Sequence, residues 1–496
     1  MSRRSTPALF GLVAALTLVG CTDRTVDIDF VRSFHLEGAE PAVVPVMPSH
    51  ANIQAWGLAG GAFRGIELLN RGTFIQGVEA PEPPYWYGFG GEWIFTPEAA
   101  VTWGVIAWGR PDISATPPDT SLSLQVSGLV PWLQEADRSH SLVAWGSGAG
   151  YLMPLGADGV ESASESAELK LTDLTLEDHG LIIRLPAYKG EAGDSLHVLQ
   201  FLDGPVTTPE GEERFTNDRS RTVVRAAKLK DGLDLPSIVE TSRERELTAD
   251  VALSEGTLQT LDVDVRGDGF DAVIAEAGGV LNENAYTRVM VRPDLLGGYA
   301  LERDQNHPYV VSASFQTPEE GGPTHARFSW SDAGQFSVPS HVVFARSYEV
   351  NGVALEAGVV LPLEGATELN AAPLVGAPGP IRIDGEEVGE GFHVTASSPV
   401  ISWSAPTVGT ATGYEVRITR RTENVGSVSE ILHTTETQLR LPPVFMGGEH
   451  KEDQTFVVTV LARNDASEGY PDRVQAPKVP YGFAARATPV FTAGSR

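Results

Sequence analysis

Hydrophobic and polar residues alternate with a period of two along much of the chain. The segments Thr120–Val126, His325–Trp330 and Tyr414–Thr419 each place apolar residues at every second position. Such alternation puts one face of a strand on a core and the other in water, as in antiparallel sheets. Other runs rich in apolar residues have the length of single strands: Val101–Trp108, Leu181–Leu185, Leu196–Leu202, Thr222–Leu229, Thr287–Val291 and Tyr309–Phe315.

Glycine and proline punctuate these runs at short intervals, with 52 glycines and 34 prolines in 496 residues. No long stretch keeps the period of an amphipathic helix. Many short strands separated by such turn residues are typical of β-sandwiches and barrels. The pattern therefore predicts an all-β protein built from several tandem β-sandwich domains.

The length of the chain suits three or four domains rather than one. Polar or proline-rich joints occur at Pro111–Asp119, Asp234–Glu246 and Ala371–Pro380, and the last is the clearest because successive prolines prevent regular strand pairing. These joints predict a tryptophan-rich domain at 22–118, β-domains at 119–243 and 244–374, and a final domain at 375–496.

Two segments on either side of the middle joint have a similar rhythm. Thr120–Val126 and Glu246–Ala252 are both alternating strands that follow a polar joint and precede a glycine. This similarity suggests that the domain 244–374 repeats the domain 119–243. The alternative is that unrelated β-domains commonly share such a pattern.

The last quarter of the chain resembles a fibronectin type III domain. Pro399–Pro406 is similar to the second strand of that family with its core tryptophan, Gly413–Ile418 to the third, Thr437–Pro442 to the strand before the corner, and Phe456–Asn464 to the sixth. The family usually has tyrosine where Phe456 stands. The resemblance implies an immunoglobulin/fibronectin III-like sandwich that acts as a spacer or a binding module.

The first residues resemble the lipobox signal peptide of bacterial lipoproteins. Arg3-Arg4 precedes an apolar stretch, Ala8–Gly20, which leads directly to Cys21, the one cysteine of the chain. The stretch is shorter than the roughly 20 residues of a membrane-spanning helix, and basic residues before a short apolar run are typical of an export signal. An ordinary signal peptide with an incidental cysteine is the alternative.

The resemblance implies removal of residues 1–20 and a diacylglycerol on Cys21 that binds the membrane. Thr22 in the next position favours the outer membrane of a Gram-negative-type cell envelope. Because few residues separate the anchor from the first strands, the first domain is expected close to the membrane and the fibronectin-like domain is expected to point away.

The formal net charge of −29 restricts the classes of molecule that the protein is expected to bind. A surface this acidic repels phosphate backbones, which argues against nucleic-acid binding. With a single cysteine, the chain has no internal disulfide, so its stability must come from packing.

Seven of the nine tryptophans fall in the first third of the chain, close to an unusual aromatic run. Tyr85, Trp86, Tyr87 and Phe89 lie among prolines and glycines that indicate a loop or hairpin. Exposed rings on such a loop are candidates for stacking on sugars or gripping a partner protein. The alternative is that the rings plug the end of a sandwich.

Four carboxylates gather around two glycines further along the chain: Asp262, Asp264, Asp268 and Asp271. Closely spaced aspartates with glycine turns offer the oxygen ligands that Ca²⁺ requires. Arg266 and Val273 stand where a calcium loop would have further ligands. A solvated hairpin turn without a metal or other cofactor is therefore the alternative interpretation.

No motif in the sequence assigns a reaction. Gly193-Asp194-Ser195-Leu196 resembles the nucleophile block of one esterase family, but that family requires an α/β fold, and a turn that opens the strand Leu196–Leu202 explains these residues better. The leading hypothesis is a lipid-anchored, non-catalytic protein that presents β-sandwiches to a protein or glycan. The alternative is a carbohydrate-active or hydrolytic envelope enzyme, because the spacing of a catalytic carboxylate pair is set in space and not in sequence.

Overall fold

The structure is a computed structural model, and it confirms the all-β prediction. It describes residues 24–36, 40–46, 53–112, 120–131, 138–147, 151–155, 168–171, 176–178, 181–183, 187–207, 213–214, 219–229, 245–265, 267–282, 285–294, 309–316, 324–332, 340–363, 365–422, 426–446, 454–465, 469–471, 473–474 and 477–494. The alternating segments of the sequence all lie in strands, and short turns separate many of them.

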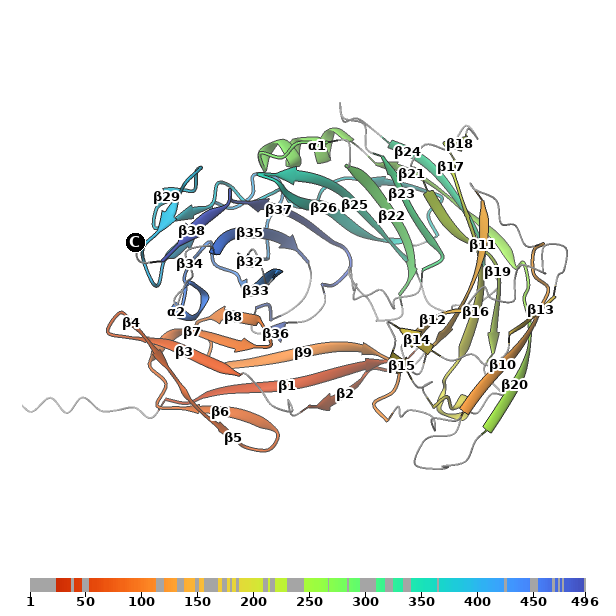
Figure 1. Ribbon diagram of the computed structural model, residues 1–496, viewed down its shortest axis with the longest axis horizontal. Coiled ribbons are helices and arrows are strands. Elements are labelled where there is room, and N and C mark those ends of the chain that lie inside the picture. The colour runs from red at the N-terminus through yellow and green to blue at the C-terminus, as the bar shows by residue number, and fades with distance from the viewer. Residues whose placement is uncertain are drawn as a thin grey trace, which may run out of the picture.

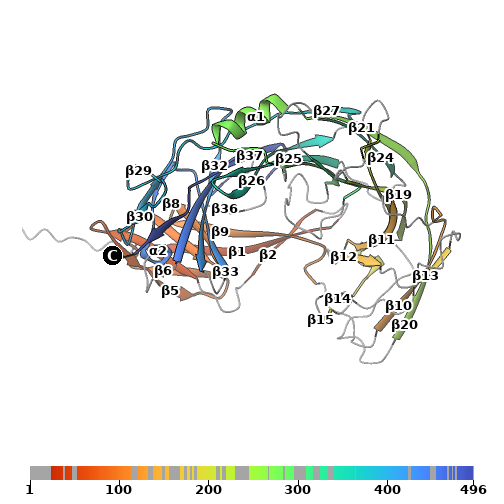
Figure 2. The ribbon, with the colours of Figure 1, turned by 45° about the horizontal axis from the view of Figure 1, so that its top comes forward.

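A single sheet of 18 strands runs through the described structure and forms its spine. Its strands come from the N-terminal, middle and C-terminal parts of the chain, and smaller sheets cover it to make sandwiches. Figures 1 and 2 show the chain following an arc that brings the C-terminal strands back beside the N-terminal ones. Strand pairing thus crosses the expected domain boundaries.

The N-terminal sandwich packs one of these covering sheets against four strands of the spine. The core between them contains Ile28, Tyr87 and Trp103, all with less than 5% of their surface exposed. The covering sheet consists of β1 (Val26–His35), β2 (Ala42–Pro45), β5 (Glu67–Asn70), β6 (Phe74–Val78), β9 (Ala100–Trp108) and β36 (Arg473–Val474). The four spine strands are β3 (Gln54–Ala59), β4 (Ala62–Gly65), β7 (Glu82–Phe89) and β8 (Glu92–Thr96).

The C-terminal part is a fibronectin III-like β-sandwich. One sheet pairs β28 (Arg382–Ile383) with β29 (Glu386–Glu387) and β31 (Val400–Ser402), which pairs with β34 (Gln438–Arg440). The facing spine strands are β32 (Gly413–Thr422), β33 (Gly426–Thr434), β35 (Gln454–Asn464) and β37 (Tyr481–Ala487), joined by β30 (His393–Val394) and β38 (Phe491–Ala493).

The core of this sandwich contains the residues on which the family resemblance rests. The ring of Trp403 lies 5.3 Å from that of Tyr414, and Phe456 is fully buried against Phe491 at 5.9 Å. Phenylalanine at position 456 keeps the aromatic packing of the corner without a hydroxyl. A short helix, α2 (Pro443–Met446), closes one end of this core.

The middle of the spine is covered by a second sheet and a helix. The spine strands here are β11 (Ser139–Gly146), β12 (Tyr151–Leu155), β16 (Leu196–Gly204), β19 (Arg219–Leu229), β22 (Tyr286–Pro293), β23 (Val311–Gln316), β25 (Ser340–Val350) and β26 (Val353–Leu363). The cover contains β17 (Val206–Thr207), β18 (Glu213–Arg214), β21 (Thr257–Val265), β24 (Thr324–Asp332), β27 (Glu368–Ala371) and α1 (Gly267–Glu276). A large core of the described residues lies between these layers.

The two segments with a similar rhythm are neighbours in space. β20 (Arg245–Ala252) pairs in parallel with β10 (Thr120–Ser127) along its whole length, and β13 (Glu168–Leu171) pairs on the other side of β10. The remaining strands form a separate hairpin, β14 (Leu176–Asp178) with β15 (Leu181–Ile183). The expected boundary at 243 thus lies between two segments that share a sheet.

The N-terminal and C-terminal sandwiches are joined to each other. β8 pairs in parallel with β33, and β9 pairs in parallel with β36. Trp86, Trp93 and Phe95 belong to the same core as the fibronectin-like strands. Parallel strand pairing and shared aromatic packing therefore hold the two sandwiches side by side. The orientation of the fibronectin-like domain relative to the membrane stays a prediction.

The joint at Ala371–Pro380 is packed rather than extended in solvent. Ala371 and Ala377 are fully buried, and the backbone N–H of Gly376 donates to the carbonyl of Val408 at 2.8 Å. The guanidinium of Arg486, on β37, donates to the carbonyls of Glu276 and Ala277 at the C-terminal end of α1. These contacts fix the fibronectin-like sandwich to the middle of the molecule.

We expect Arg486→Ala to lower the free energy of unfolding by about 1 to 2 kcal/mol, because it leaves carbonyls at the helix C-terminus without a cationic donor. Arg382, an exposed arginine of β28, provides the matched control, and Arg382→Ala should change stability by less than about 0.5 kcal/mol. Urea unfolding measures both. Equal losses in the two variants would contradict a capping role for Arg486.

Candidate functional site

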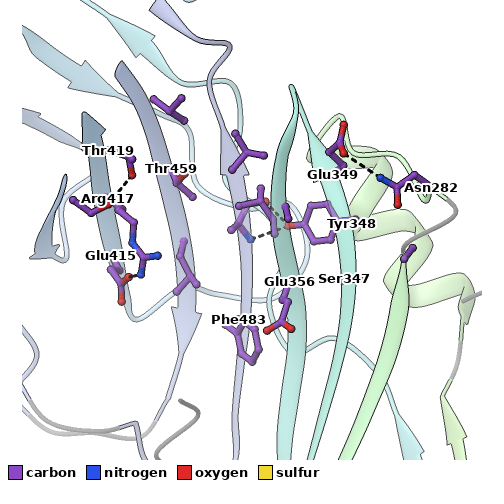
Figure 3. Close-up of a pocket in the computed structure, with 18 of the residues that line it drawn as sticks. Asn282, Ser347, Tyr348, Glu349, Glu356, Glu415, Arg417, Thr419, Thr459 and Phe483 are labelled. Carbon is purple, nitrogen blue, oxygen red and sulfur yellow. Dashed lines mark hydrogen bonds and ion pairs between the residues drawn. The ribbon is translucent and has the colours of Figure 1, made fainter. Parts of the chain in front are cut away.

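A candidate site in the described structure is a groove where the spine bends. It has a volume of about 600 Å³ and lies between the outer face of the fibronectin-like sheet and the hairpin β25–β26. Its floor is formed by β35 and β37 (Figure 3). The groove exists because β37 pairs with β26 only at Tyr481–Phe483, and beyond Phe483 the two strands separate.

Strand periodicity positions the polar side chains of one wall. On β32 the even residues from Tyr414 to Ile418 face the sandwich core, so Glu415, Arg417 and Thr419 face the groove. Arg417 donates to Glu415 at 3.0 Å, and Thr419 shares a hydrogen bond of 2.9 Å with Ser429.

The facing wall is also made of side chains that satisfy one another. Glu356 accepts hydrogen bonds from the hydroxyl of Tyr286 at 2.9 Å and from Arg288 at 3.1 Å. Asn282 donates to Glu349 at 3.0 Å. Burial and the neighbouring Glu356 raise the pKa of Tyr286, so its hydroxyl stays protonated at neutral pH. The groove therefore presents charges that are already compensated.

The aromatic run Tyr85, Trp86, Tyr87 and Phe89 lies in the first strand of a hairpin, which is one of the two structures that its prolines and glycines predict. β7 forms a hairpin with β8 through Gly90-Gly91, whose positive φ angles of 60° and 88° suit glycine. Both faces of β7 are covered, so the rings of Tyr85, Trp86 and Tyr87 are at most 2% exposed. The rings are core residues, as the alternative interpretation has it: the tyrosines fill the N-terminal sandwich, with Phe89 half-buried against it, and Trp86 fills the core shared with the C-terminal sandwich.

The aspartates considered for calcium lie on two different elements. Asp262 and Asp264 are on β21, where Arg327 donates to both oxygens of Asp262 at 2.6 and 2.7 Å and His325 lies 3.7 Å from Asp264. The bonds from Arg327 lower the pKa of Asp262. Asp271 follows in α1 and pairs with Arg346 at 2.8 Å.

The side chain of Asp268 lies outside the described residues. Among the described residues, no group of three or more histidine, cysteine or acidic side chains is placed to hold a metal ion. The hairpin turn expected here is wrong: β21 is followed by helix α1. Calcium binding at these aspartates stays a prediction, and it would require a cation to compete with Arg327 and Arg346.

Helix α1 was missed by the sequence reasoning although its signal is present. Phe270, Val273, Ile274 and Ala277 recur at helical spacing, and all four are buried in the main core. The glycines and aspartates that precede these residues are typical of a turn, so the sequence was interpreted as a turn and the short helix was not predicted.

The esterase-like block forms the predicted turn. A 3₁₀ turn, Gly190–Ala192, and Gly193 with a φ of 88° lead into β16. Asp194 is fixed by Arg110, whose guanidinium donates to both carboxylate oxygens at 2.7 and 2.9 Å. The hydroxyl of Ser195 lies 3.0 Å from Nε2 of His197, and both residues are at most 3% exposed. The residues of this block are therefore buried in the core, where Asp194 is ion-paired with Arg110 and Ser195 is hydrogen-bonded to His197.

A buried histidine lies near the seam between the two end sandwiches. His433, on β33, pairs with Ile94 of β8, and its Nδ1 is 3.2 Å from the hydroxyl of Tyr470. Burial lowers its pKa from 6.5 to about 4, while Glu415 partly opposes this shift and Arg463 adds to it. The folded protein thus favours the neutral imidazole.

Acidification is expected to destabilise the protein through this histidine. Because the folded pKa lies below the unfolded one, the contribution is complete above pH 6.5 and is lost as the pH falls toward 4. Between pH 7.5 and 4.5 this loss amounts to about 2 to 3 kcal/mol of unfolding free energy. Urea unfolding at the two pH values should show a smaller loss for His433→Gln than for the wild type. The exposed His325 supplies the control, and a His433→Gln variant as pH-sensitive as His325→Gln would contradict the assignment.

Cys21 lies outside the described residues. In the described part of the chain, neither helix combines the length and the hydropathy that crossing a membrane requires.

Comparisons with known proteins add little to this geometry. No protein-family model matches the chain, and no curated protein sequence matches it. Among solved structures, the chain is similar to the FN1-FN3 domains of chicken CNTN1, with 11% identity, 77% of this chain and 99% of that chain covered, and a TM-score of 0.14. A Streptococcal ancillary pilin is similar at 11% identity, with 70% and 99% covered and a TM-score of 0.12. At such scores neither likeness carries an argument, and the fibronectin III-like assignment rests on the strand pairing described above.

Proposed function

We propose that this protein is a lipid-anchored, non-catalytic lipoprotein of the bacterial cell envelope that presents β-sandwich surfaces to a protein or glycan partner. The anchor is Cys21, placed after the basic and apolar residues of a lipobox-like signal. Thr22 favours the outer membrane as its location. Two acyl chains on Cys21 would bind the bilayer through hydrocarbon burial, at about 0.8 kcal/mol per CH₂ group.

The observation that supports a binding or structural role is that the acidic side chains of the groove are hydrogen-bonded to neighbouring side chains. Glu349, Glu356 and Glu415 each accept a hydrogen bond from a donor on their own wall, at 2.9 to 3.1 Å. Such pairs fix the shape of a surface and orient it for recognition.

Replacing the anchor cysteine tests the proposal. We expect Cys21→Ser to move the protein from the membrane fraction to the soluble fraction, because no acyl chain can be attached to serine by this route. Thr22→Ser is the matched control and should stay with the membranes. Incorporation of labelled palmitate into the wild type, and not into Cys21→Ser, is expected in the same cells. If Cys21→Ser sediments with the membranes as the wild type does, the anchor is refuted.

A further inference from the structure

We propose that the groove between β32–β33 and β25–β26 binds a neutral oligosaccharide. The inference deepens the proposed function by naming the ligand class of this site. It rests on three features of the groove: the balance of its charges, the donors and acceptors that its side chains still offer, and the closure of the β37 edge.

The balance of charge disfavours an ionic ligand. The acidic residues that line the groove are Glu349, Glu356 and Glu415, and the basic ones are Arg417 and Arg421. A third arginine, Arg288, donates to Glu356. The site is therefore close to neutral in a chain whose net charge is −29. An anion would meet a repulsive surrounding field, and a cation would have to displace guanidinium groups from their carboxylates.

The paired side chains retain capacity for a ligand with many hydroxyls. A carboxylate has about four lone-pair sites and a guanidinium five N–H donors, so the two bonds that Glu356 accepts and the one bond that Arg417 donates use only part of them. The hydroxyls of Thr419 and Thr459 add groups that both donate and accept. Sugar hydroxyls also donate and accept, and they match such a mixed surface without needing a net charge.

The aromatic ring of Tyr286 lines the groove. Tyr286 is 37% exposed, and its hydroxyl is held by Glu356, so the ring has a fixed position. Fixed planar groups bind with a small loss of side-chain entropy. The ring thus supplies an apolar face next to the polar pairs, and Figure 3 shows the Glu356 and Glu415 walls facing each other across the floor strands.

The edge of β37 is closed within the groove, which disfavours the addition of a peptide strand to β37. Where β37 leaves β26, the hydroxyl of Tyr348 accepts from the N–H of Ala485 at 3.1 Å and donates to its carbonyl. Asn351 donates to the carbonyl of Ala487 at 3.0 Å. A peptide that adds a strand needs free backbone groups on the receiving edge, and on β37 these groups are occupied by side chains.

The volume agrees with a short oligosaccharide. About 600 Å³ lies within the range of about 300 to 1,000 Å³ that is typical of small-molecule sites. Because the groove is open and half polar, we expect modest affinity, with a Kd of about 0.1 to 1 mM.

Calorimetric titration of the full chain in detergent tests the proposal. The probes are chitohexaose and maltohexaose as neutral sugars, hexagalacturonate as an anionic sugar, and hexaglycine as an extended peptide. We expect at least one neutral sugar to bind, and both Tyr286→Ala and Arg417→Ala to weaken its binding by tenfold or more. Thr260→Ala, on the outer face of β21, is the control and should bind as the wild type does. Thermal unfolding of each variant shows whether it is folded.

Three outcomes would overturn the proposal: no binding of either neutral sugar at 10-fold the expected Kd, unchanged binding by folded groove variants, or tighter binding of hexagalacturonate or hexaglycine. These outcomes are separate from the anchor test. A protein that binds sugar but remains in membranes after Cys21→Ser refutes the anchor alone, and a protein that is released but binds no sugar refutes the ligand class alone.

Discussion

Replacing Trp93 by alanine is expected to lower the free energy of unfolding by about 3 to 5 kcal/mol, the cost of deleting a large buried aromatic side chain. Trp93 belongs to β8 of the N-terminal sandwich, yet its ring packs 4.8 Å from Phe445 of the C-terminal one. Its indole N–H donates to Glu430 at 2.9 Å. The truncation would remove this bond and leave a cavity in the core that the two sandwiches share.

Hydrogen exchange measures which strands are destabilised when Trp93 is replaced. We expect faster exchange in β33 and β35 of Trp93→Ala, because these strands border the shared core. Trp145→Ala is the matched control: Trp145 is 1% exposed, but it lies on β11 in the middle of the molecule. If both variants leave β33 and β35 equally protected, the two end sandwiches do not depend on each other.

The second large effect is expected at Asp194. Arg110 and Asp194 form a bidentate pair with side-chain exposures of 7% and 1%, and the pair joins the end of β9 to the turn before β16. This bonding raises the pKa of Arg110, so the guanidinium remains charged. Asp194→Ala would leave that charge buried without its main partner, and we expect a loss of about 3 to 5 kcal/mol.

Two further variants separate the pair from its surroundings. Arg110 also bonds Asp112 at 2.6 Å, but the side chain of Asp112 is 68% exposed. Asp112→Asn should therefore cost less than about 1 kcal/mol. The double variant Arg110→Met/Asp194→Leu should recover much of the loss, because apolar side chains tolerate burial. Urea unfolding compares the variants, and an Asp194→Ala variant as stable as Asp112→Asn would contradict this account.

The sequence was sufficient to predict the strands and the C-terminal fold because these depend on local patterns. Alternation along Tyr414–Thr419 and the spacing of Trp403 and Phe456 reflect which face of each strand is buried. Such information is present within a few residues. The turn at Gly193 was predictable for the same reason.

The arrangement of the sandwiches depends on contacts between residues far apart in the chain. No residue near Trp93 in the sequence indicates that its hydrogen-bond partner is Glu430. The alternation of apolar residues within β10 and β20 likewise does not indicate that these two strands pair. The rings of Tyr85 and Trp86 looked difficult to bury together because a single sandwich covers only one face of a strand; here a second sandwich covers the other. The groove was invisible for the same reason, since its walls come from separate segments of the chain.

The pairing of β8 with β33 is the central structural claim, and a single cross-link tests it most directly. Glu92 and Ile431 are register partners, and neighbouring strands lie about 4.8 Å apart, within the Cα separation of about 4.4 to 6.8 Å that a disulfide spans. In a Cys21→Ser background, Glu92→Cys with Ile431→Cys should form an intramolecular disulfide on mild oxidation, whereas Glu92→Cys with Thr260→Cys should not. If the first pair stays reduced, or links only between molecules as the control does, the N-terminal and C-terminal sandwiches are not joined as described.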